Sequence, residues 1–394
     1  MNLSFINKVL PSARMLVSRQ QMLTARLDER EDFLNIQDEE SFRAFPFVKA
    51  ESGILTVDET TDPDEIVNDL KIKLSAWYDE RLIHPDYIII KGLGVIAIAS
   101  HASYLDVLLG APVKPVNITA GKVQDKIVIV TGGAQGFGGG IAEMLYAEGA
   151  NVVIADMNEE AGLKMTEILN KGNQANQAYF VKVNVADAES VEVMVASAVK
   201  QFGGLDVIIS NAGILRAGGL DEMTSETFSL MTDVNYKGYF LCAKYASAVM
   251  KVQSQYRKGY FTDIIQVNSK SGLKGSNRNF AYAGGKFGGI GLTQSFAMEL
   301  MPYRIKVNSI CPGNFFEGPL WSDPEKGLFV QYLKAGKVPG AKSVADVKAF
   351  YEAQVPAGRG CRVLDVVRAI FYIIEQEYET GQAVPVTGGQ NMLN

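Results

Sequence analysis

The stretch Ile127-Val-Ile-Val-Thr131-Gly-Gly-Ala-Gln-Gly136-Phe-Gly138 decides the fold of this chain. A run of β-branched residues leads directly into closely spaced glycines, and an amphipathic segment follows over residues 141–149. This order predicts a strand, a tight turn and a helix, which together form the first unit of a dinucleotide-binding fold. In such a unit, backbone amides and the positive end of the helix dipole bind a pyrophosphate. The spacing differs from the common G-x-G-x-x-G, so an ordinary glycine-rich turn is the alternative.

Downstream of this unit, short apolar runs alternate with amphipathic stretches to the end of the chain. Strands separated by helices in this way form parallel sheets whose two faces are covered by helices. The sequence therefore predicts an α/β fold with a Rossmann-type, doubly wound parallel sheet. The predicted strands are Ile127–Val130, Asn151–Ala155, Ala178–Asn184, Val207–Ser210, Asp263–Asn268, Lys306–Cys311 and Ala383–Val386.

The first 120 residues do not follow this alternation. A helix is predicted over Thr60–Glu80, and Tyr87–Ala99 is predicted to be a hairpin that turns at Gly92–Gly94. Pro112, Pro115 and the following glycine indicate a linker. We therefore expect a small α+β appendage over residues 1–120, with a structural or oligomerisation role, and an NAD-binding domain over residues 121–394.

Composition narrows the class of protein. The chain has 394 residues, of which 47% are hydrophobic and 21% charged, so there is ample material for a core. A net charge of −6 argues against a nucleic-acid binder. Three cysteines without a CxxC pair and only two histidines, His84 and His101, argue against disulfides and metal sites. We expect a cytoplasmic protein with a small-molecule substrate and no metal, membrane or nucleic-acid partner.

An acidic residue ends the second predicted strand. Asp156 stands 18 residues after Gly138, where a carboxylate would accept hydrogen bonds from the adenosine ribose and repel a 2′-phosphate. Met157 and Asn158 bring no cation to attract that phosphate, so NAD is expected rather than NADP. The alternative role for Asp156 is to cap the next helix.

A second set of residues carries proton chemistry. Tyr282 and Lys286 are one helical turn apart on the same face, and a nearby ammonium favours the phenolate, so the tyrosine is a candidate general acid and base. Ser269, 13 residues upstream, could bind the reacting oxygen. Asn235 could bind a water that links the lysine to solvent. A YxxxK pattern alone occurs by chance; the ordered set is much more specific.

From about Lys126 onward the chain resembles the short-chain dehydrogenase/reductase family, in its TGxxxGxG loop, its Asn211-Ala-Gly turn and its Asn-Ser-Tyr-Lys tetrad. The resemblance implies reversible hydride transfer between NAD and a carbon that bears oxygen, in a subunit that forms dimers or tetramers. Two departures are Asn184 in place of the usual aspartate at the adenine and a missing threonine after Pro312-Gly313. The expected cofactor-binding residues are Gly132, Gln135, Gly136, Phe137, Gly138, Asp156, Asn184, Val185, Asn211, Ala212, Gly213, Tyr282, Lys286, Pro312 and Gly313.

Stretches such as 268–272, 354–361 and 386–390 resemble bacterial sorbitol-6-phosphate 2-dehydrogenases more narrowly. This implies oxidation of a sugar alcohol phosphate to fructose 6-phosphate. Unphosphorylated polyols, deoxy-sugar aldehydes and a non-catalytic NAD-sensing module are the alternatives. Cations between the catalytic serine and tyrosine could bind the phosphate by charge-assisted hydrogen bonds, although solvated loops also carry such charges. The candidates are Lys270, Lys274 and Arg278, with Arg216, Arg359 and Arg362 as further possibilities.

Two remaining segments carry weaker expectations. The insertion after Pro312-Gly313, running to about Val355, is expected to be a mobile lid over the substrate. Residues 86–97 resemble the end of a class II aldolase-type domain. Such an aldolase needs three histidine ligands, so with two histidines the appendage is expected to be a remnant without that activity.

Overall fold

The computed structural model describes residues 3–36, 38–58, 60, 62–334, 336 and 338–392. A seven-stranded sheet forms its centre, with the strand order β11-β10-β9-β8-β5-β6-β7, and every neighbouring pair is parallel. From β5 the chain adds β6 and β7 on one side and then crosses over to add β8 to β11 on the other side. This change of side leaves a crevice at the carboxyl ends of β5 and β8. The predicted α/β, doubly wound fold is therefore confirmed. The strands are β5 (Ile127–Thr131), β6 (Asn151–Asp156), β7 (Ala178–Lys182), β8 (Val207–Ser210), β9 (Thr262–Val267), β10 (Ile305–Pro312) and β11 (Ala383–Val386).

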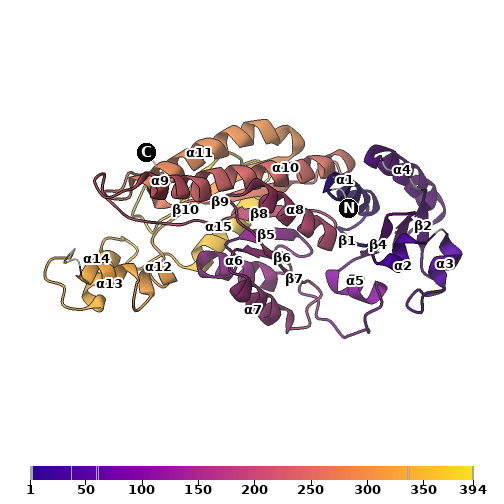
Figure 1. Cartoon of the computed structure of the whole chain (residues 1–394), viewed down its shortest axis with the longest axis horizontal. Coiled ribbons are helices and arrows are strands. Elements are labelled where there is room, and N and C mark those ends of the chain that lie inside the picture. Colours follow the sequence, from indigo (N-terminus) through magenta and orange to yellow (C-terminus); the bar gives the residue numbers. More distant parts are fainter. Residues whose placement is uncertain are drawn as a thin grey trace.

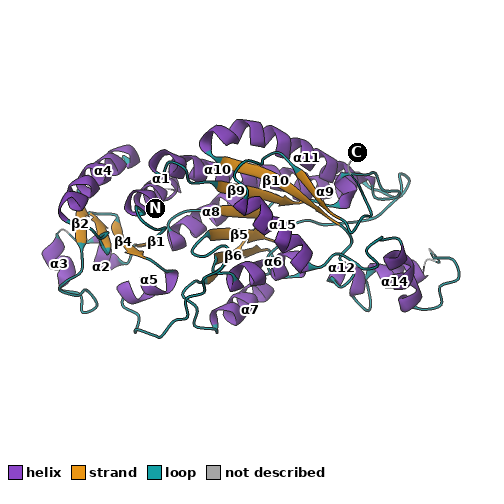
Figure 2. Ribbon diagram, turned by 180° about the vertical axis from the view of Figure 1, so that it is seen from behind, coloured by secondary structure: helices purple, strands orange, loops and turns teal. Residues whose placement is uncertain are grey.

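Helices cover both faces of this sheet (Figures 1 and 2). One face packs against α6 and α15, and the other packs against α8, α10 and α11. Each helix buries an apolar stripe on the β-branched surface of the strands, which is why the central strands β5, β8 and β9 are fully buried. These helices and their neighbours are α6 (Gly136–Ala147), α7 (Glu159–Asn170), α8 (Ala188–Phe202), α9 (Ser225–Thr232), α10 (Gly238–Tyr256), α11 (Phe280–Leu300) and α15 (Val363–Glu375).

The N-terminal residues form a second, four-stranded sheet with the order β1-β4-β3-β2. Strands β3 and β4 pair as the predicted antiparallel hairpin, whereas β2 is parallel to β3. One face of the sheet packs on a cluster of phenylalanines that includes Phe33 and Phe42. The elements are α1 (Leu3–Val17), β1 (Thr24–Asp28), α2 (Glu31–Leu34), α3 (Glu39–Arg43), β2 (Ile54–Val57), α4 (Pro63–Glu80), β3 (Tyr87–Ile90), β4 (Gly94–Ala99) and α5 (Ala102–Leu108).

The insertion after β10 is a helical unit with a core of its own. It contains α12 (Pro319–Ser322), α13 (Leu328–Lys334) and α14 (Val344–Ala353). Phe316 and Trp321 are almost fully buried there, together with Phe329. The unit lies at one end of the long axis, and the N-terminal sheet lies at the other (Figure 1). The insertion is therefore a folded element beside the sheet, and its mobility stays a prediction.

No helix in the part of the chain that the structure describes is both long enough and apolar enough to cross a bilayer.

Candidate active site

A cavity of about 1120 Å³ lies at the carboxyl ends of the central strands. Its wall begins at the glycine loop, passes Asp156 and the Asn211-Ala-Gly turn, and reaches Ser269 and Tyr282. The far side is formed by side chains of the helical insertion, including Trp321 and Tyr351. The cavity thus joins most of the predicted cofactor-binding and catalytic residues in one continuous space, whereas Gly138, Asn235 and Lys286 lie outside its lining.

The glycine loop is shaped by close backbone contacts. A Cβ on Gly138 would lie 1.9 Å from the carbonyl oxygen of Gly132, so no side chain fits there. Gly132 and Gly136 have φ angles of 62° and 61°, a conformation that favours glycine. A Cβ on Gly136 would meet no atom within 4 Å, because that position faces open space. Such a cradle at the start of α6 fits the pyrophosphate of a dinucleotide.

The Asn211-Ala-Gly turn is tied to this loop through Thr131. The threonine hydroxyl accepts hydrogen bonds from the backbone amides of Asn211, at 3.0 Å, and Ala212, at 3.1 Å. The side-chain amide of Asn211 donates to the carbonyl of Thr131 at 3.0 Å. Gly213 is required beside it, since a Cβ there would lie 2.8 Å from Oδ1 of Asn235. The floor of the cavity is therefore rigid.

Two phenylalanines close one side of the cofactor region. Phe137 of the glycine loop and Phe315, which follows β10, stack with ring centroids 4.3 Å apart. Both rings line the cavity, as do Gln135, Pro312 and Gly313. Sequence reasoning missed Phe315 as a cofactor-side residue, because only the fold brings the two loops together.

Asp156 lines the cavity with its carboxylate held by two backbone amides. It accepts hydrogen bonds from Ala134 of the glycine loop at 3.1 Å and from Asn158 at 2.9 Å. The cap of α7 is Asn158, which accepts from Ala161 at 3.1 Å. The capping alternative for Asp156 is therefore wrong, because its carboxylate bonds back to the glycine loop.

At the adenine end, Asn184 and Val185 both line the cavity. The side-chain oxygen of Asn184 accepts a hydrogen bond from the amide of Ala186 at 3.1 Å, and Asn184 itself is exposed. Val185 is buried and lies against Gly238, where a Cβ would be 3.1 Å from the valine side chain. Both residues are thus placed by the turn that follows β7.

Lys286 lies beneath the catalytic end of the cavity and is only 4% exposed. Its ammonium donates a hydrogen bond to the carbonyl of Val267 at 2.9 Å and lies 5.6 Å from the centre of the Tyr282 ring. Burial lowers the pKa of Lys286 to about 8. The lysine is therefore close to losing its charge in this pocket.

The pKa of Tyr282 differs from the sequence expectation. Burial raises the pKa of this phenol above its usual range, and a hydrogen bond with Ser269 only partly opposes the rise. The expected lowering of this pKa is wrong for this structure, because desolvation of the buried phenol is the largest effect on it. Tyr282 thus holds its proton at neutral pH, as a general acid requires.

Ser269 stands just after β9 with its hydroxyl beside the phenol. Its hydroxyl oxygen accepts a hydrogen bond from the amide of Ser271 at 3.1 Å. Its own amide donates to the side chain of Asn268 at 2.8 Å. The side-chain nitrogen of Asn268, Nδ2, in turn donates to the backbone carbonyl of Lys286 at 2.9 Å, which links the serine to α11. Ser269, Tyr282 and Lys286 are therefore placed as one unit.

Asn235 lies in a π-helical turn, Asp233–Lys237, and both of its side-chain polar atoms are already engaged. Its Oδ1 accepts from the amide of Ile214 at 2.9 Å, and its Nδ2 donates to the carbonyl of Ile214 at 2.8 Å. These two bonds fix the side chain of Asn235, and its expected binding of a water that links the lysine to solvent stays a prediction. Turns of this kind recur at functional sites.

Comparison with known proteins agrees with this geometry. The family model described as short chain dehydrogenase matches residues 126–321. The sorbitol-6-phosphate 2-dehydrogenase of Escherichia coli is 34% identical over 272 residues, which are 68% of this chain and 100% of that enzyme. The chain belongs to the short-chain dehydrogenase family. It is therefore an oxidoreductase.

Two further members of the short-chain dehydrogenase family resemble this chain. The trans-4-hydroxycyclohexanecarboxylate dehydrogenase of Sinomonas cyclohexanicum is 31% identical over 69% of this chain and 95% of its own length. A crystal structure of sorbitol-6-phosphate 2-dehydrogenase from Erwinia amylovora is 35% identical, with a TM-score of 0.62, and covers 68% of this chain and 100% of its own. The relatives thus match this chain over about two thirds of its length.

The three cations expected to bind substrate differ in their surroundings in this dehydrogenase. Lys270 lines the cavity and donates a hydrogen bond to the side chain of Gln390 at 2.9 Å, and burial lowers the pKa of its ammonium. Arg278 lines the cavity but forms an ion pair with Glu222. Lys274 is exposed and lies outside the residues that line the cavity. Lys270 is thus the strongest of the three candidates.

Sequence reasoning missed two polar residues in this dehydrogenase. The Oδ1 of Asn279, which lines the cavity, is buried and has no hydrogen-bond partner among the described residues. Gln390, close to the end of the chain, reaches Lys270 from a distance of 120 residues. Asn279 belongs to no motif, and the stretch 386–390 gives no sign that Gln390 contacts Lys270, so only the fold reveals these two positions.

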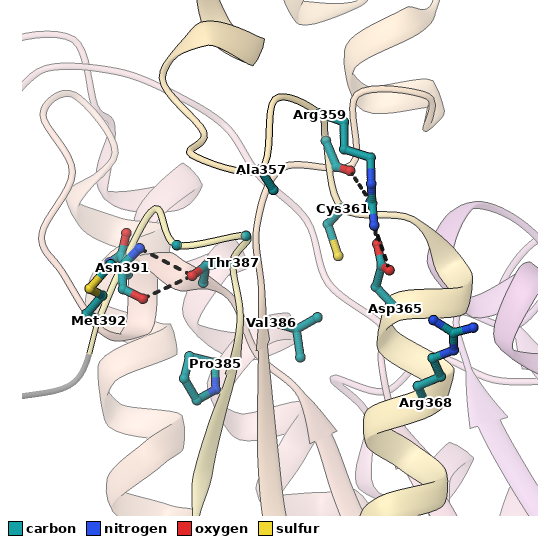
Figure 3. A pocket seen from close by; sticks show the side chains of 13 residues that line it. Ala357, Arg359, Cys361, Asp365, Arg368, Pro385, Val386, Thr387, Asn391 and Met392 are labelled. Atoms are coloured by element: carbon teal, nitrogen blue, oxygen red, sulfur yellow. Dashed lines mark hydrogen bonds and ion pairs between the residues drawn. The ribbon is translucent and has the colours of Figure 1, made fainter.

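A second cavity of the dehydrogenase, of about 470 Å³, lies between the start of α15 and the C-terminal segment (Figure 3). Arg359 forms an ion pair with Asp365 there, at 2.6 Å, and Thr387 bonds to the backbone of Asn391. Arg362 is directed to Glu317 at 3.8 Å. Arg359 lines this second cavity, so a role for it in the substrate cavity finds no support.

The structure describes no group of three or more His, Cys, Asp or Glu side chains that could hold a metal ion, within its described ranges. His84 bonds to the carbonyl of Pro85, and His101 bonds to Asp125 at 2.8 Å. The two histidines thus have separate partners.

Proposed function

We propose that the enzyme catalyses NAD-dependent oxidation of a sugar alcohol phosphate, with sorbitol 6-phosphate and fructose 6-phosphate as the reacting pair. The observation that carries this proposal is Lys270, a cavity-lining cation that has no acidic partner among the described residues. A half-buried ammonium beside a neutral amide is stabilised when an anionic group approaches it. The names of the relatives from Escherichia coli and Erwinia amylovora support the same substrate.

NAD is the proposed cofactor because of the residues beside Asp156. The carboxylate is fixed by Ala134 and Asn158 and would repel a 2′-phosphate. The exposed neighbour Met157 offers no positive charge to recruit one. The nicotinamide, when bound, supplies or accepts the hydride.

The tetrad would move the proton. Tyr282 would donate its proton to the carbonyl oxygen during reduction and accept one during oxidation. The hydroxyl of Ser269 would bind the same oxygen. Lys286 would stabilise the phenolate once a charged cofactor and substrate occupy the cavity. Asn235, whose side chain is fixed by two hydrogen bonds with Ile214, would bind a water that links Lys286 to solvent.

We also propose a homodimer or homotetramer. Helices α10 and α11 carry exposed apolar side chains, among them Phe240, Phe287 and Met298, with exposed fractions of 42%, 47% and 76%. Such exposed apolar faces commonly mark protein contacts. A cytoplasmic location is proposed because Cys242, Cys311 and Cys361 are all free thiols. The resemblance of residues 86–97 to an aldolase-type domain stays a prediction, since the family model begins at residue 126.

The proposed function is tested by following NADH absorbance with a panel of substrates. The panel contains sorbitol 6-phosphate, another alditol phosphate, free sorbitol, lactaldehyde and trans-4-hydroxycyclohexanecarboxylate, each with NAD and with NADP. The highest kcat/KM is expected for sorbitol 6-phosphate with NAD. A higher value for free sorbitol or lactaldehyde would contradict the phosphate assignment. Tight NADH binding without turnover of any substrate would support the sensing module instead.

Trans-4-hydroxycyclohexanecarboxylate tests a second substrate class, the alicyclic hydroxy acids. Aromatic side chains from the insertion, Trp321, Tyr332 and Tyr351, line the cavity opposite the tetrad and suit an apolar ring. Lys270 could bind a carboxylate by the same charge-assisted hydrogen bond. If the alicyclic hydroxy acid is the better substrate, Lys270 still binds the anionic group of the substrate, but the assignment of a sugar alcohol phosphate is wrong.

A further inference from the structure

The N-terminal residues lie far from the chemistry of this enzyme. In the described part of the chain, the lining of the substrate cavity begins at Gly132, so residues 3–109 supply no side chain to it. The four-stranded sheet and the cavity-covering insertion stand at opposite ends of the molecule (Figure 1). The N-terminal segment contacts α8 and α10, Asp206 at the amino end of β8, and Gln177 just before β7. Its role therefore concerns the fold of the dehydrogenase domain.

A buried ion pair joins the two parts. Arg14 of α1 donates two hydrogen bonds to the carboxylate of Asp206, at 2.9 and 2.8 Å, and both side chains are 0% exposed. The two residues are 192 positions apart. Asp206 stands directly before β8 and also accepts from the amide of Ile127, the first residue of β5, at 2.8 Å. Arg14 itself is held by the carbonyl of Leu23 at 2.7 Å.

The charge on Asp206 depends on this partner. Burial alone would raise the pKa of Asp206, yet the pKa is lowered, because Arg14 and Lys126 lie beside the carboxylate. An isolated carboxylate at this depth is strongly unfavourable. Asp206 is also the group that fixes the start of two central strands, one leading to the glycine loop and the other to the Asn211-Ala-Gly turn. The N-terminal segment thus supplies the counter-ion for a buried junction of the cofactor-binding sheet.

The end of α8 packs closely against the N-terminal segment. A Cβ on Gly203, at the end of α8, would lie 2.7 Å from the Cβ of Ala25 in β1. A Cβ on Gly204 would lie 2.4 Å from the side chain of Gln253 and 2.9 Å from that of Arg14. Larger residues at these two positions would push the segment away. The end of α8 therefore fits the backbone of β1 closely.

The apolar contact is continuous with the core. Val9, Leu10 and Ala13 of α1 are 0% exposed and belong to the same buried cluster as Phe202 and Met250. Removal of α1 would expose this face of α8 and α10 to water. Burial of such apolar area is the main stabilising contribution in folding.

We propose that residues 3–109 form an obligatory part of the dehydrogenase fold in this chain, covering α8 and α10 and supplying Arg14 as the buried counter-ion of Asp206. The proposal goes beyond the catalytic function, because it holds whatever the substrate is. Relatives whose whole length matches 68% of this chain fold without such a segment. The dependence is therefore a property of the α8–α10 face of this chain.

The first test asks whether the two parts separate. A protease recognition sequence is inserted between Val113 and Lys114, in a stretch where residues 111–115 are all exposed. The full chain is purified, cleaved under native conditions and passed over a gel-filtration column. The fragments are expected to elute together and to melt in one transition. Separation with precipitation of the larger fragment would also support the proposal. Separation that leaves the larger fragment soluble and able to bind NADH would overturn it.

The second test concerns the ion pair. Arg14→Met is expected to lower the melting temperature by about 5 °C, because the buried carboxylate of Asp206 loses two hydrogen bonds and keeps only Lys126 as a neighbouring cation. The double variant Arg14→Met/Asp206→Asn is expected to recover part of this loss. Lys200→Ala is the matched control, because it removes a partly exposed ion pair with Glu29 at the same interface and should change little.

The ion-pair test stays decisive if Arg14→Met does not fold. In that case the double variant must yield more soluble protein than the single variant. A double variant that is no better than Arg14→Met, or an Arg14→Met protein that melts like the wild type, would overturn the counter-ion role.

Discussion

Replacing Lys270 with methionine removes a positive charge from the substrate cavity and keeps most of the side-chain volume. Lys270 donates to Gln390 at 2.9 Å in the absence of substrate, and that neutral hydrogen bond would be exchanged for one to a phosphate. A hydrogen bond to a charged group contributes about 1.5–3 kcal/mol. Because Lys270 is only partly buried, the lower half of this range applies. The expected loss in kcat/KM for sorbitol 6-phosphate is thus about 10- to 40-fold.

The assay compares kcat/KM for sorbitol 6-phosphate and for free sorbitol in the wild type and in Lys270→Met. The loss is expected on the phosphorylated substrate alone, because free sorbitol offers no anion. Lys274→Met is the matched control, since Lys274 is exposed and does not line the cavity. Equal losses on both substrates would refute the reasoning, and so would an equal effect of the control variant.

Three further predictions follow from the site. Burial lowers the pKa of Lys286 to about 8 from an unfolded value of 10.5, so the unfolded chain binds this proton more tightly than the folded chain does. The buried charge therefore destabilises the folded protein, and this destabilisation is complete below pH 8. Lys286→Met should therefore stabilise the cofactor-free protein at pH 7 by up to about 3 kcal/mol in urea unfolding, with less effect as pH rises toward 10.5; destabilisation at pH 7 would contradict this. Asp156→Ala should raise the KM for NAD about tenfold and reduce the preference for NAD over NADP in kcat/KM, whereas Asn158→Ala should leave that preference unchanged. An unchanged preference for NAD in Asp156→Ala would count against the role of Asp156 in cofactor choice. Gly138→Ala should abolish NADH binding in a fluorescence titration, since its Cβ would lie 1.9 Å from the Gly132 carbonyl, and wild-type affinity would show that the loop is not the cradle.

The parallel sheet could be predicted because its strands are local patterns. Val207–Ser210 and Ala383–Val386 have the predicted bounds, and the other predicted strands differ only at their ends. The third strand stops at Lys182 rather than Asn184, because Asn184 turns back to bond with Ala186. A β-branched run flanked by turn residues carries this information without any tertiary contact.

The order of the catalytic residues could also be predicted, but the state of their protons could not. The helical spacing of Tyr282 and Lys286 places them together, as the ring-to-ammonium distance of 5.6 Å shows. Their pKa values depend on burial, which comes from β10 and the turns that contain Ser271 and Asn235 packing against α11. Desolvation cannot be inferred from residue spacing. The spacing therefore predicted a lowered pKa for Tyr282, whereas burial raises it.

Contacts between distant residues were out of reach for the same reason. Arg14 and Asp206, like Lys270 and Gln390, pair over more than one hundred positions, and no sequence pattern indicates either pairing. The insertion after Pro312-Gly313 was expected to be a mobile lid, and its helices were not predicted. Its three helices are stabilised by an aromatic core around Trp321, which forms only when the segment folds back on itself.

The central claim is that Tyr282 exchanges a proton with the substrate oxygen beside a bound nicotinamide. The most direct measurement is the rate of NADH formation from sorbitol 6-phosphate by the wild type and by Tyr282→Phe, with NADH affinity measured on both proteins. The account predicts a loss in kcat of about 100- to 10,000-fold with unchanged NADH affinity. A Tyr282→Phe protein that oxidises its substrate at the wild-type rate would contradict it.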